Sequence, residues 1–213
     1  YHHILDVGCG TGYLTGKLQN HWPQAQVMGL DFAIGMIEVA RGKDAKIIWV
    51  VADGHQLPLK TAGFELVVSN LAYQWSGDLR QAFSEAQRVL TKKGFFAATL
   101  FGFNTGKELF LSLREAQCGI QVVRLPDFQE VKKALKCSGF NEYKAEQREI
   151  KIEFLNMPEL LKWHKIIGAN HLSSDGFLGP ETLSRAADIY QKRFPYGQGV
   201  AATFEVIEVY AQK

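Results

Sequence analysis

The stretch Ile4-Leu5-Asp6-Val7-Gly8-Cys9-Gly10-Thr11-Gly12 decides the fold of this chain, because an apolar run gives way there to three closely spaced glycines. The run His3–Val7 predicts a buried β-strand, and Tyr13–Asn20 predicts a helix directly after the glycines. Glycines at such a junction let the backbone turn tightly and approach a ligand without interference from Cβ atoms. We therefore expect a small molecule to bind at Gly8–Gly12.

The spacing of the three glycines narrows the choice of ligand. Dinucleotide-binding loops read G-x-G-x-x-G and place a pyrophosphate at the helix N-terminus. Here the third glycine comes one residue earlier, which gives G-x-G-x-G and a tighter loop. This loop favours a ligand without a pyrophosphate, and a glycine turn that binds nothing is the alternative.

Composition and charge exclude several other classes of protein. Of the 213 residues, 46% are hydrophobic and 22% are charged, as in soluble globular domains rather than in disordered, collagen-like or coiled-coil chains. The chain has 24 Lys and Arg against 22 Asp and Glu, a net charge of +2, with no long block of one sign. The sequence therefore predicts no bulk attraction to nucleic acid or to a membrane surface.

Cysteine and histidine usage argues against a disulfide scaffold and against a metal site. The three cysteines show no C-x-x-C spacing, and the histidines show no ligand spacing, so no metal is predicted. No apolar run approaches the roughly 20 residues of a membrane span, and no signal peptide is recognised. We therefore expect a cytoplasmic protein.

Short apolar runs alternate with amphipathic stretches through the first half of the chain, which is the pattern of βα units around a parallel sheet. Further strands are predicted at Gln26–Leu30, Ala45–Val51, Phe64–Ser69 and Phe95–Phe101. Helices are predicted at Ala33–Arg41 and Leu79–Leu90. The pair Lys93-Gly94 is interpreted as the stop signal of the last helix. We expect an α/β fold with helices on both faces of the sheet.

The regular alternation breaks after Gly106. Helices are predicted at Lys107–Ala116, Asp127–Lys136, Pro158–Ile167 and Glu181–Arg193, and strands at Tyr143–Phe154 and Ala201–Tyr210. The two long strands flank a mostly helical stretch, so residues 155–199 are interpreted as a lid inserted into a single domain that spans residues 1–213. The chain starts at Tyr1, directly before its first strand, and we expect that an N-terminal segment is missing from it.

Acidic residues follow the second and third predicted strands. Asp31 lies 21 residues beyond Gly10, where a carboxylate in such folds accepts hydrogen bonds from both hydroxyls of a ribose; its alternative role is a helix N-cap. Asp53, followed by Gly54, could accept from an adenine amino group, or could be a turn residue. Phe32 and Met36 could flank the adenine, or could belong to the core.

The fourth predicted strand ends in a polar and aromatic segment, Ser69-Asn70-Leu71-Ala72-Tyr73-Gln74-Trp75. Open α/β sheets bind ligands outside the carboxyl ends of their strands, so this segment should face the reaction centre. We expect Tyr73, Gln74 and Trp75 to contact substrate. A helix cap with a surface tryptophan is the alternative.

These motifs together resemble those of class I S-adenosylmethionine-dependent methyltransferases. The resemblance implies a Rossmann-like sheet of seven strands with the last one antiparallel, and the helical lid between the last two. It implies S-adenosylmethionine as cofactor and S-adenosylhomocysteine as product. The implied cofactor-binding residues are Asp6, Gly8, Cys9, Gly10, Gly12, Asp31, Phe32, Met36, Ala52, Asp53, Gly54, Asn70 and Leu71.

Two segments resemble a narrower group. Ser69-Asn70-Leu71-Ala72-Tyr73-Gln74-Trp75-Ser76-Gly77-Asp78-Leu79 and Lys165-Ile166-Ile167-Gly168-Ala169-Asn170-His171-Leu172 are similar to the malonyl-acyl-carrier-protein O-methyltransferases of the biotin pathway. That resemblance implies methylation of the free carboxylate of malonyl-acyl-carrier protein. Members of this group carry an N-terminal helical segment before the first strand that helps to cover the site, and the present chain lacks it.

A carboxylate acceptor sets simple chemical requirements. It is ionised at pH 7 and needs no general base, so we expect no catalytic acid or base, but burial requires a cation beside it. Lys165 is the first candidate, with Arg185 and Arg148 after it, and His171 could hydrogen-bond substrate. Each could instead be a solvated charge or, for the histidine, a structural residue.

An acyl-carrier protein is acidic and should dock on basic residues. The available lysines are Lys92, Lys93, Lys132, Lys133 and Lys136, although such a run is usually a solvated face. Two other functions stay open: a methyltransferase for another small carboxylate or a quinone precursor, and a cofactor-binding partner protein without catalysis.

Overall fold

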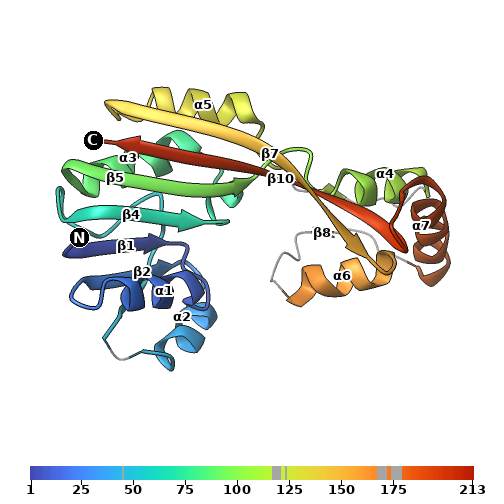
Figure 1. Ribbon diagram of the computed structural model, residues 1–213, viewed down its shortest axis with the longest axis horizontal. Coiled ribbons are helices and arrows are strands. Elements are labelled where there is room, and N and C mark those ends of the chain that lie inside the picture. The colour runs from blue at the N-terminus through green and yellow to red at the C-terminus, as the bar shows by residue number, and fades with distance from the viewer. Residues whose placement is uncertain (45, 117–120, 123, 167–171, 174–178) are drawn as a thin grey trace. The chain divides into compact units, whose positions relative to one another are not determined.

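The computed structural model describes residues 1–213 except 45, 117–120, 123, 167–171 and 174–178 (Figure 1). The described chain divides into two compact units. The first consists of Tyr1–Phe101, Pro126–Gln147 and Ile207–Lys213, and the second of Gly102–Leu125 and Arg148–Val206.

The main sheet has the strand order β3-β2-β1-β4-β5-β10-β7, and the short β9 (Pro195–Tyr196) pairs with β10. Its strands are β1 His3–Val7, β2 Gln26–Asp31, β3 Ile48–Val51, β4 Phe64–Asn70, β5 Leu90–Phe101, β7 Glu142–Phe154 and β10 Gly199–Gln212. From β3 to β5 each neighbouring pair is parallel. The parallel sheet that the alternating pattern predicts is therefore confirmed.

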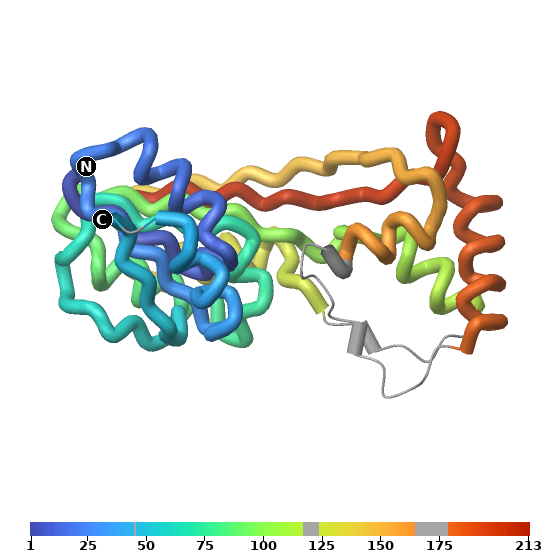
Figure 2. Tube along the Cα trace, turned by 90° about the horizontal axis from the view of Figure 1, so that it is seen from below, coloured from blue at the N-terminus to red at the C-terminus, as the bar shows by residue number. Residues whose placement is uncertain are grey.

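The last strand runs against its neighbour. The backbone N–H of Lys93 donates to the carbonyl of Lys213 at 2.9 Å, and that of Lys213 donates to the carbonyl of Gly94 at 3.1 Å. These bonds join the start of β5 to the end of the chain, and the arrows of β5 and β10 point in opposite directions in Figure 1. Figure 2 shows β7 and β10 side by side. The predicted antiparallel last strand is confirmed.

Helices cover both faces of the parallel strands, because successive strand residues are apolar on both sides. On one face, Ile4 and Val27 pack with Leu18 of α1 (Tyr13–His21). On the other, Leu5 and Val67 belong to a larger cluster that includes residues of α3 (Leu79–Val89) and α5 (Phe128–Lys136). Helix α2 (Ile34–Arg41) lies beside β2 and β3.

The interpretation of Lys93-Gly94 as a helix stop is wrong. Helix α3 begins after the N-cap Asp78 and ends at Val89, and the chain enters β5 at Leu90. The register of β5 against β4 then shifts before Phe95, and Lys93 has a φ of 67°. The left-handed residue that resembled a helix end therefore serves an irregularity within a strand, where the extra residues must leave the ladder.

The second unit contains α4 (Lys107–Glu115), α6 (Met157–Ile166), α7 (Pro180–Arg193) and the antiparallel pair β6 (Gln121–Val122) and β8 (Leu172–Ser173). Helices α4 and α7 pack together, and the buried carboxylate of Glu108 accepts a hydrogen bond from the N–H of Thr203 at 3.0 Å. Helices α6 and α7 lie between β7 and β10 in the chain, as predicted. That they act as a lid stays a prediction.

A substitution in the larger core tests its packing. Phe83 is fully buried and lies edge-on to Tyr73 and Phe96, with ring centroids 5.5 Å apart in both pairs. We expect Phe83→Ala to lower the free energy of unfolding by about 3–5 kcal/mol, through lost burial and a residual cavity. Phe95→Ala, at a half-exposed site, is the control and should cost much less. Urea denaturation measures both, and equal losses would contradict the assignment of Phe83 to the core.

Candidate cofactor and substrate site

The glycine loop after β1 follows a path that requires glycine. Gly8, Gly10 and Gly12 all have a positive φ, of 72°, 53° and 80°, a region that other residues rarely adopt. A Cβ built at Gly8 would overlap the Cβ of Ala72, whereas one at Gly10 would meet no described atom within 4 Å. The loop is thus closely packed at Gly8 and open at Gly10, which leaves room for a ligand there.

Asp31 at the end of β2 joins this loop to the start of α2. Its Oδ2 accepts a hydrogen bond from the N–H of Gly10 at 2.8 Å, and its Oδ1 accepts one from the N–H of Ala33 at 2.9 Å. Ala33, and not Asp31, is the N-cap residue of α2. A carboxylate has about four acceptor positions, so Asp31 retains capacity for ligand hydroxyls.

Asp6 is buried beneath the loop and only half satisfied. Its Oδ2 accepts a hydrogen bond from Thr15 Oγ1 at 2.6 Å, while Oδ1 finds no partner among the described residues. Burial raises the pKa of Asp6 to about 7, and the negative charge of Asp31 adds to the rise, against the lowering effect of the Thr15 hydrogen bond. Its neighbour Cys9 is also buried, and burial raises the pKa of that thiol.

The end of β4 and the segment after it carry further buried polar atoms. Within the described chain Ser69 Oγ, Tyr73 OH and Gln74 Oε1 are buried without a hydrogen-bond partner. Burial and then the charge of Asp6 raise the pKa of Tyr73, so its hydroxyl stays protonated. An unsatisfied buried polar group costs about 1–3 kcal/mol, and a bound ligand or water could supply the missing partners.

The structure decides some of the alternatives that the sequence left open. Phe32 is 79% exposed and Met36 is 37% exposed, so neither is a core residue. Tyr73 is only 4% exposed and packs in the core with Phe83 and Phe96, whereas Trp75 is 40% exposed. Asn70 accepts a hydrogen bond from Thr99 Oγ1 at 2.7 Å.

The other predicted substrate residues fall in the second unit. The guanidinium of Arg185 on α7 donates to the carbonyl of Ala116, and Arg148 is exposed on β7. Lys165 belongs to α6, where its side chain is not described, and His171 lies outside the described residues. Substrate contacts by all of these residues stay predictions.

Sequence reasoning missed the partners of Asp53. Asp53 Oδ1 accepts hydrogen bonds from the N–H of His55 and from its ring Nδ1, both at 2.8 Å. His55 Nε2 lies 2.6 Å from Ser76 Oγ. The spacing Asp53-x-His55 is typical of a turn in which the aspartate accepts a hydrogen bond from the residue two positions later. This spacing could have predicted the contact between Asp53 and His55.

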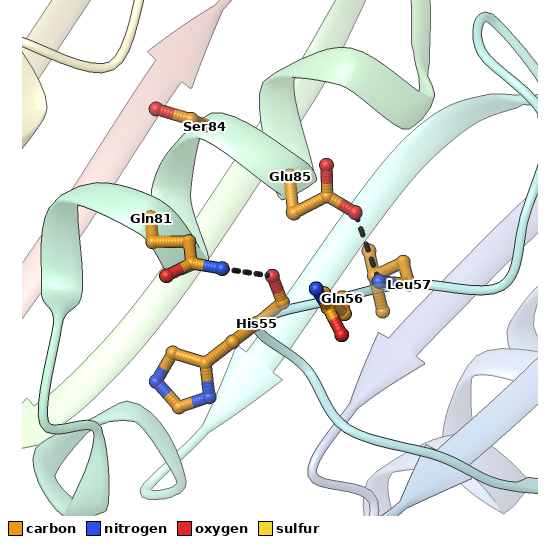
Figure 3. Close-up of a pocket in the computed structure, with 6 residues that line it drawn as sticks. All are labelled: His55, Gln56, Leu57, Gln81, Ser84 and Glu85. Carbon is orange, nitrogen blue, oxygen red and sulfur yellow. Dashed lines mark hydrogen bonds between the residues drawn. The ribbon is translucent and has the colours of Figure 1, made fainter.

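A pocket of about 370 Å³ adjoins His55 and is shown in Figure 3. It is lined by His55, Gln56, Leu57, Gln81, Ser84 and Glu85. The Glu85 carboxylate in this lining already accepts hydrogen bonds, from the N–H of Leu57 at 2.8 Å and from the guanidinium of Arg88. The glycine loop, and not this pocket, carries the predicted cofactor contacts.

Comparison with known proteins identifies the family. A model of the methyltransferase domain matches residues 4–94. The malonyl-acyl-carrier protein O-methyltransferase of Geobacter sulfurreducens is 35% identical over 216 residues, which cover 96% of this chain and 81% of that protein. This chain belongs to the malonyl-acyl-carrier protein O-methyltransferase family. It is therefore a methyltransferase, as the resemblance of its motifs implies.

Solved structures confirm the fold of this methyltransferase. The YcgJ protein of Bacillus subtilis superposes with a TM-score of 0.68 at 16% identity, over 100% of this chain and 92% of that one. Phosphoethanolamine N-methyltransferase 2 of Haemonchus contortus, in complex with S-adenosyl-L-methionine, gives 0.58 at 21% identity over 100% of this chain and 48% of that one.

The described residues of the methyltransferase contain neither a membrane-spanning helix nor a metal-binding cluster. None of its described helices is long and apolar enough to cross a membrane. In the same part of the chain, no three or more His, Cys, Asp and Glu side chains form a group that could hold a metal ion.

The predicted ribose contact can be tested at Asp31. We expect Asp31→Ala to weaken S-adenosylmethionine binding by about 1.5–3 kcal/mol, because a charged acceptor is lost, with Asp31→Asn intermediate. The control is Glu38→Ala, which removes an exposed carboxylate from α2. Calorimetry measures the affinities, and unchanged binding by Asp31→Ala would remove this residue from the site.

The raised pKa of Asp6 predicts how stability depends on pH. An unfolded aspartate titrates near 3.9 and folded Asp6 at about 7, so the folded state binds the extra proton and the contribution of Asp6 to stability falls as the pH rises from about 4 to 7. Asp6→Asn cannot ionise and retains an oxygen for Thr15. Without cofactor, it should exceed the parent in stability by up to about 4 kcal/mol at pH 8 and match it at pH 4. Urea unfolding at both pH values checks this, and a pH-independent difference would contradict it.

Proposed function

We propose that this methyltransferase transfers a methyl group from S-adenosylmethionine to the free carboxylate of malonyl-acyl-carrier protein, in the cytoplasm. The products are the methyl ester and S-adenosylhomocysteine. The observation that carries this proposal is the relative from Geobacter sulfurreducens, because it is similar along nearly the whole chain and is named for this reaction.

The residues at the strand ends fit the cofactor. The loop is open at Gly10, and the adjacent carboxylate of Asp31 would accept hydrogen bonds from the ribose hydroxyls. Asp53 would accept from the adenine amino group, with the exposed Phe32 and Met36 beside the base. The buried, half-satisfied Asp6 favours a positively charged ligand, since a nearby cation stabilises the ionised carboxylate.

The cofactor supplies an electrophilic methyl group on its sulfonium. The acceptor carboxylate is already ionised at neutral pH and needs no base, so the chain has to align the two reactants and exclude water. Alignment alone can contribute roughly 7–11 kcal/mol of the barrier. The hydroxyl of Tyr73 and the amide oxygen of Gln74, which have no hydrogen-bond partner in the described part of the chain, lie on the segment that would orient the acceptor.

A cation must accompany the acceptor carboxylate, and a basic surface should bind the acidic carrier protein. Lys165, Arg185 and Arg148 are the candidates for the cation. Among the candidate docking lysines, Lys132 and Lys133 lie on α5 with exposed side chains, and the ammonium of Lys132 lies 5.5 Å from the centroid of the Phe128 ring.

The reaction is tested by transfer of radiolabelled methyl to carrier protein. Malonyl-acyl-carrier protein should accept the label, and acetyl-acyl-carrier protein, which lacks the free carboxylate, should not. Free small acids and quinone precursors form the second arm. Transfer to one of these but not to the malonyl protein would overturn the proposed acceptor, and cofactor binding without any product would favour a partner protein without catalysis.

The cation is tested on α6, which carries two lysines three residues apart. We expect Lys165→Ala to lower kcat/KM for malonyl-acyl-carrier protein about 10- to 100-fold, the scale of a lost hydrogen bond to a charged group, with unchanged affinity for S-adenosylmethionine. Lys162→Ala, at an exposed position on the same helix, is the matched control. Steady-state kinetics would exclude Lys165 if both variants behaved alike, and the same assay would then be applied to Arg185 and Arg148.

A further inference from the structure

A chain of hydrogen bonds links the loop after β3 to the segment after β4. Asp53 follows β3, and Ser76 follows the short helix η1 (Tyr73–Trp75). The ring of His55 bridges them, with Nδ1 2.8 Å from Asp53 Oδ1 and Nε2 2.6 Å from Ser76 Oγ. These two loops carry the predicted contacts to adenine and to the methyl acceptor, respectively.

The partners of the ring define its protons. An ionised carboxylate can only accept, so Nδ1 of His55 carries a hydrogen and donates it to Asp53. In the neutral ring Nε2 is then an acceptor, and Ser76 donates its hydroxyl hydrogen to it. The hydrogen bonds from the N–H and the ring of His55 hold the pKa of Asp53 below its usual range, and keep Asp53 available as an acceptor.

The backbone of His55 is anchored separately from its ring. Its carbonyl accepts a hydrogen bond from Gln81 Nε2 of α3 at 3.0 Å, and Figure 3 shows the ring directed away from Glu85. Asp53 is 52% exposed at its side chain, and the N–H of His55 alone would leave its carboxylate free to turn about that one hydrogen bond. A ring held at both nitrogens restricts it to one orientation, which lowers the entropic cost of binding a ligand.

We propose that His55 is a positioning residue, which orients the Asp53 carboxylate toward the amino group of adenine and, through Ser76, couples it to the segment that faces the methyl acceptor. This proposal rests on the proposed function only in taking S-adenosylmethionine as the ligand. It does not depend on the identity of the acceptor.

The sequence of groups Asp53, His55, Ser76 is also that of a nucleophilic triad. In such a triad the aspartate is buried beside the histidine, whereas Asp53 is half exposed and stands among the cofactor residues. The geometry therefore favours positioning over a nucleophilic serine.

The test compares two ligands that differ at the group which Asp53 should recognise. S-adenosylhomocysteine carries the adenine amino group, and S-inosylhomocysteine has an oxygen in its place. His55→Ala should weaken binding of the adenosyl ligand about 3- to 10-fold, the scale of one hydrogen bond, and leave the inosyl ligand nearly unchanged. His55→Asn places an amide donor near the position of Nδ1 and should restore most of the affinity.

Further variants separate orientation from folding. Ser76→Ala should give a smaller loss of the same selectivity, and Ser84→Ala, a pocket serine without a place in the hydrogen-bond chain, should give none. Equal losses for both ligands, or equal losses in His55→Ala and His55→Asn, would overturn the positioning role. If His55→Ala fails to fold, Ser76→Ala and His55→Asn still test the positioning role. In both variants the measured quantity is the ratio of the affinities for the adenosyl and the inosyl ligand.

Three outcomes distinguish this proposal from the proposed function and from a nucleophilic serine. If the parent chain does not bind S-adenosylhomocysteine, the cofactor assignment and the role of His55 both fail. If it binds S-adenosylhomocysteine but does not methylate malonyl-acyl-carrier protein, only the proposed acceptor fails. Hydrolysis of p-nitrophenyl acetate that disappears in both Ser76→Ala and His55→Ala would identify a nucleophilic serine and overturn the positioning role.

Discussion

The close packing of the glycine loop against the end of β2 is the constraint on which the site depends. The N–H groups of Gly8 and Cys9 share the carbonyl of Leu30, and that of Gly10 reaches the carboxylate of Asp31. Ala72 occupies the space that a Cβ at Gly8 would need. One backbone conformation thus brings together the carboxyl ends of three neighbouring strands, and any larger residue at Gly8 would have to displace Ala72.

The electrostatics of the site follow from the same packing. Asp6 is buried below the loop, and this burial, together with the negative charge of Asp31, raises its pKa to about 7. Two carboxylates in such proximity favour hydrogen-bond donors and positive charge, which a ribose and a sulfonium compound provide. At Asp53 the environment acts in the opposite direction, because hydrogen bonds from His55 lower its pKa. Near neutral pH, Asp53 is therefore ionised while Asp6 titrates.

The parallel part of the fold was predictable because its signals are local. The runs at β1, β2 and β4 are apolar on both faces. A glycine loop follows β1, and β2 ends at Asp31. Lys93-Gly94 was misread because a positive φ serves a helix end and a strand irregularity equally well. The role of His55 was not predicted because one of its two ring contacts is to Ser76, 21 residues away. Hydrophobic periodicity contains no information about such a pair.

Local sequence signals were enough to predict the class of fold, the glycine loop after the first strand and the acidic residue at the end of the second. Each of these depends on residues close together in the chain or on strand ends that must align. The assembled fold was needed to show that Phe32 and Met36 are exposed while Tyr73 is buried. It was also needed to show that Asp6 Oδ1 has no partner among the described residues and that His55 joins two loops. Burial, pKa and hydrogen-bond partners arise from segments distant in the chain. These properties exist only once the strands have assembled.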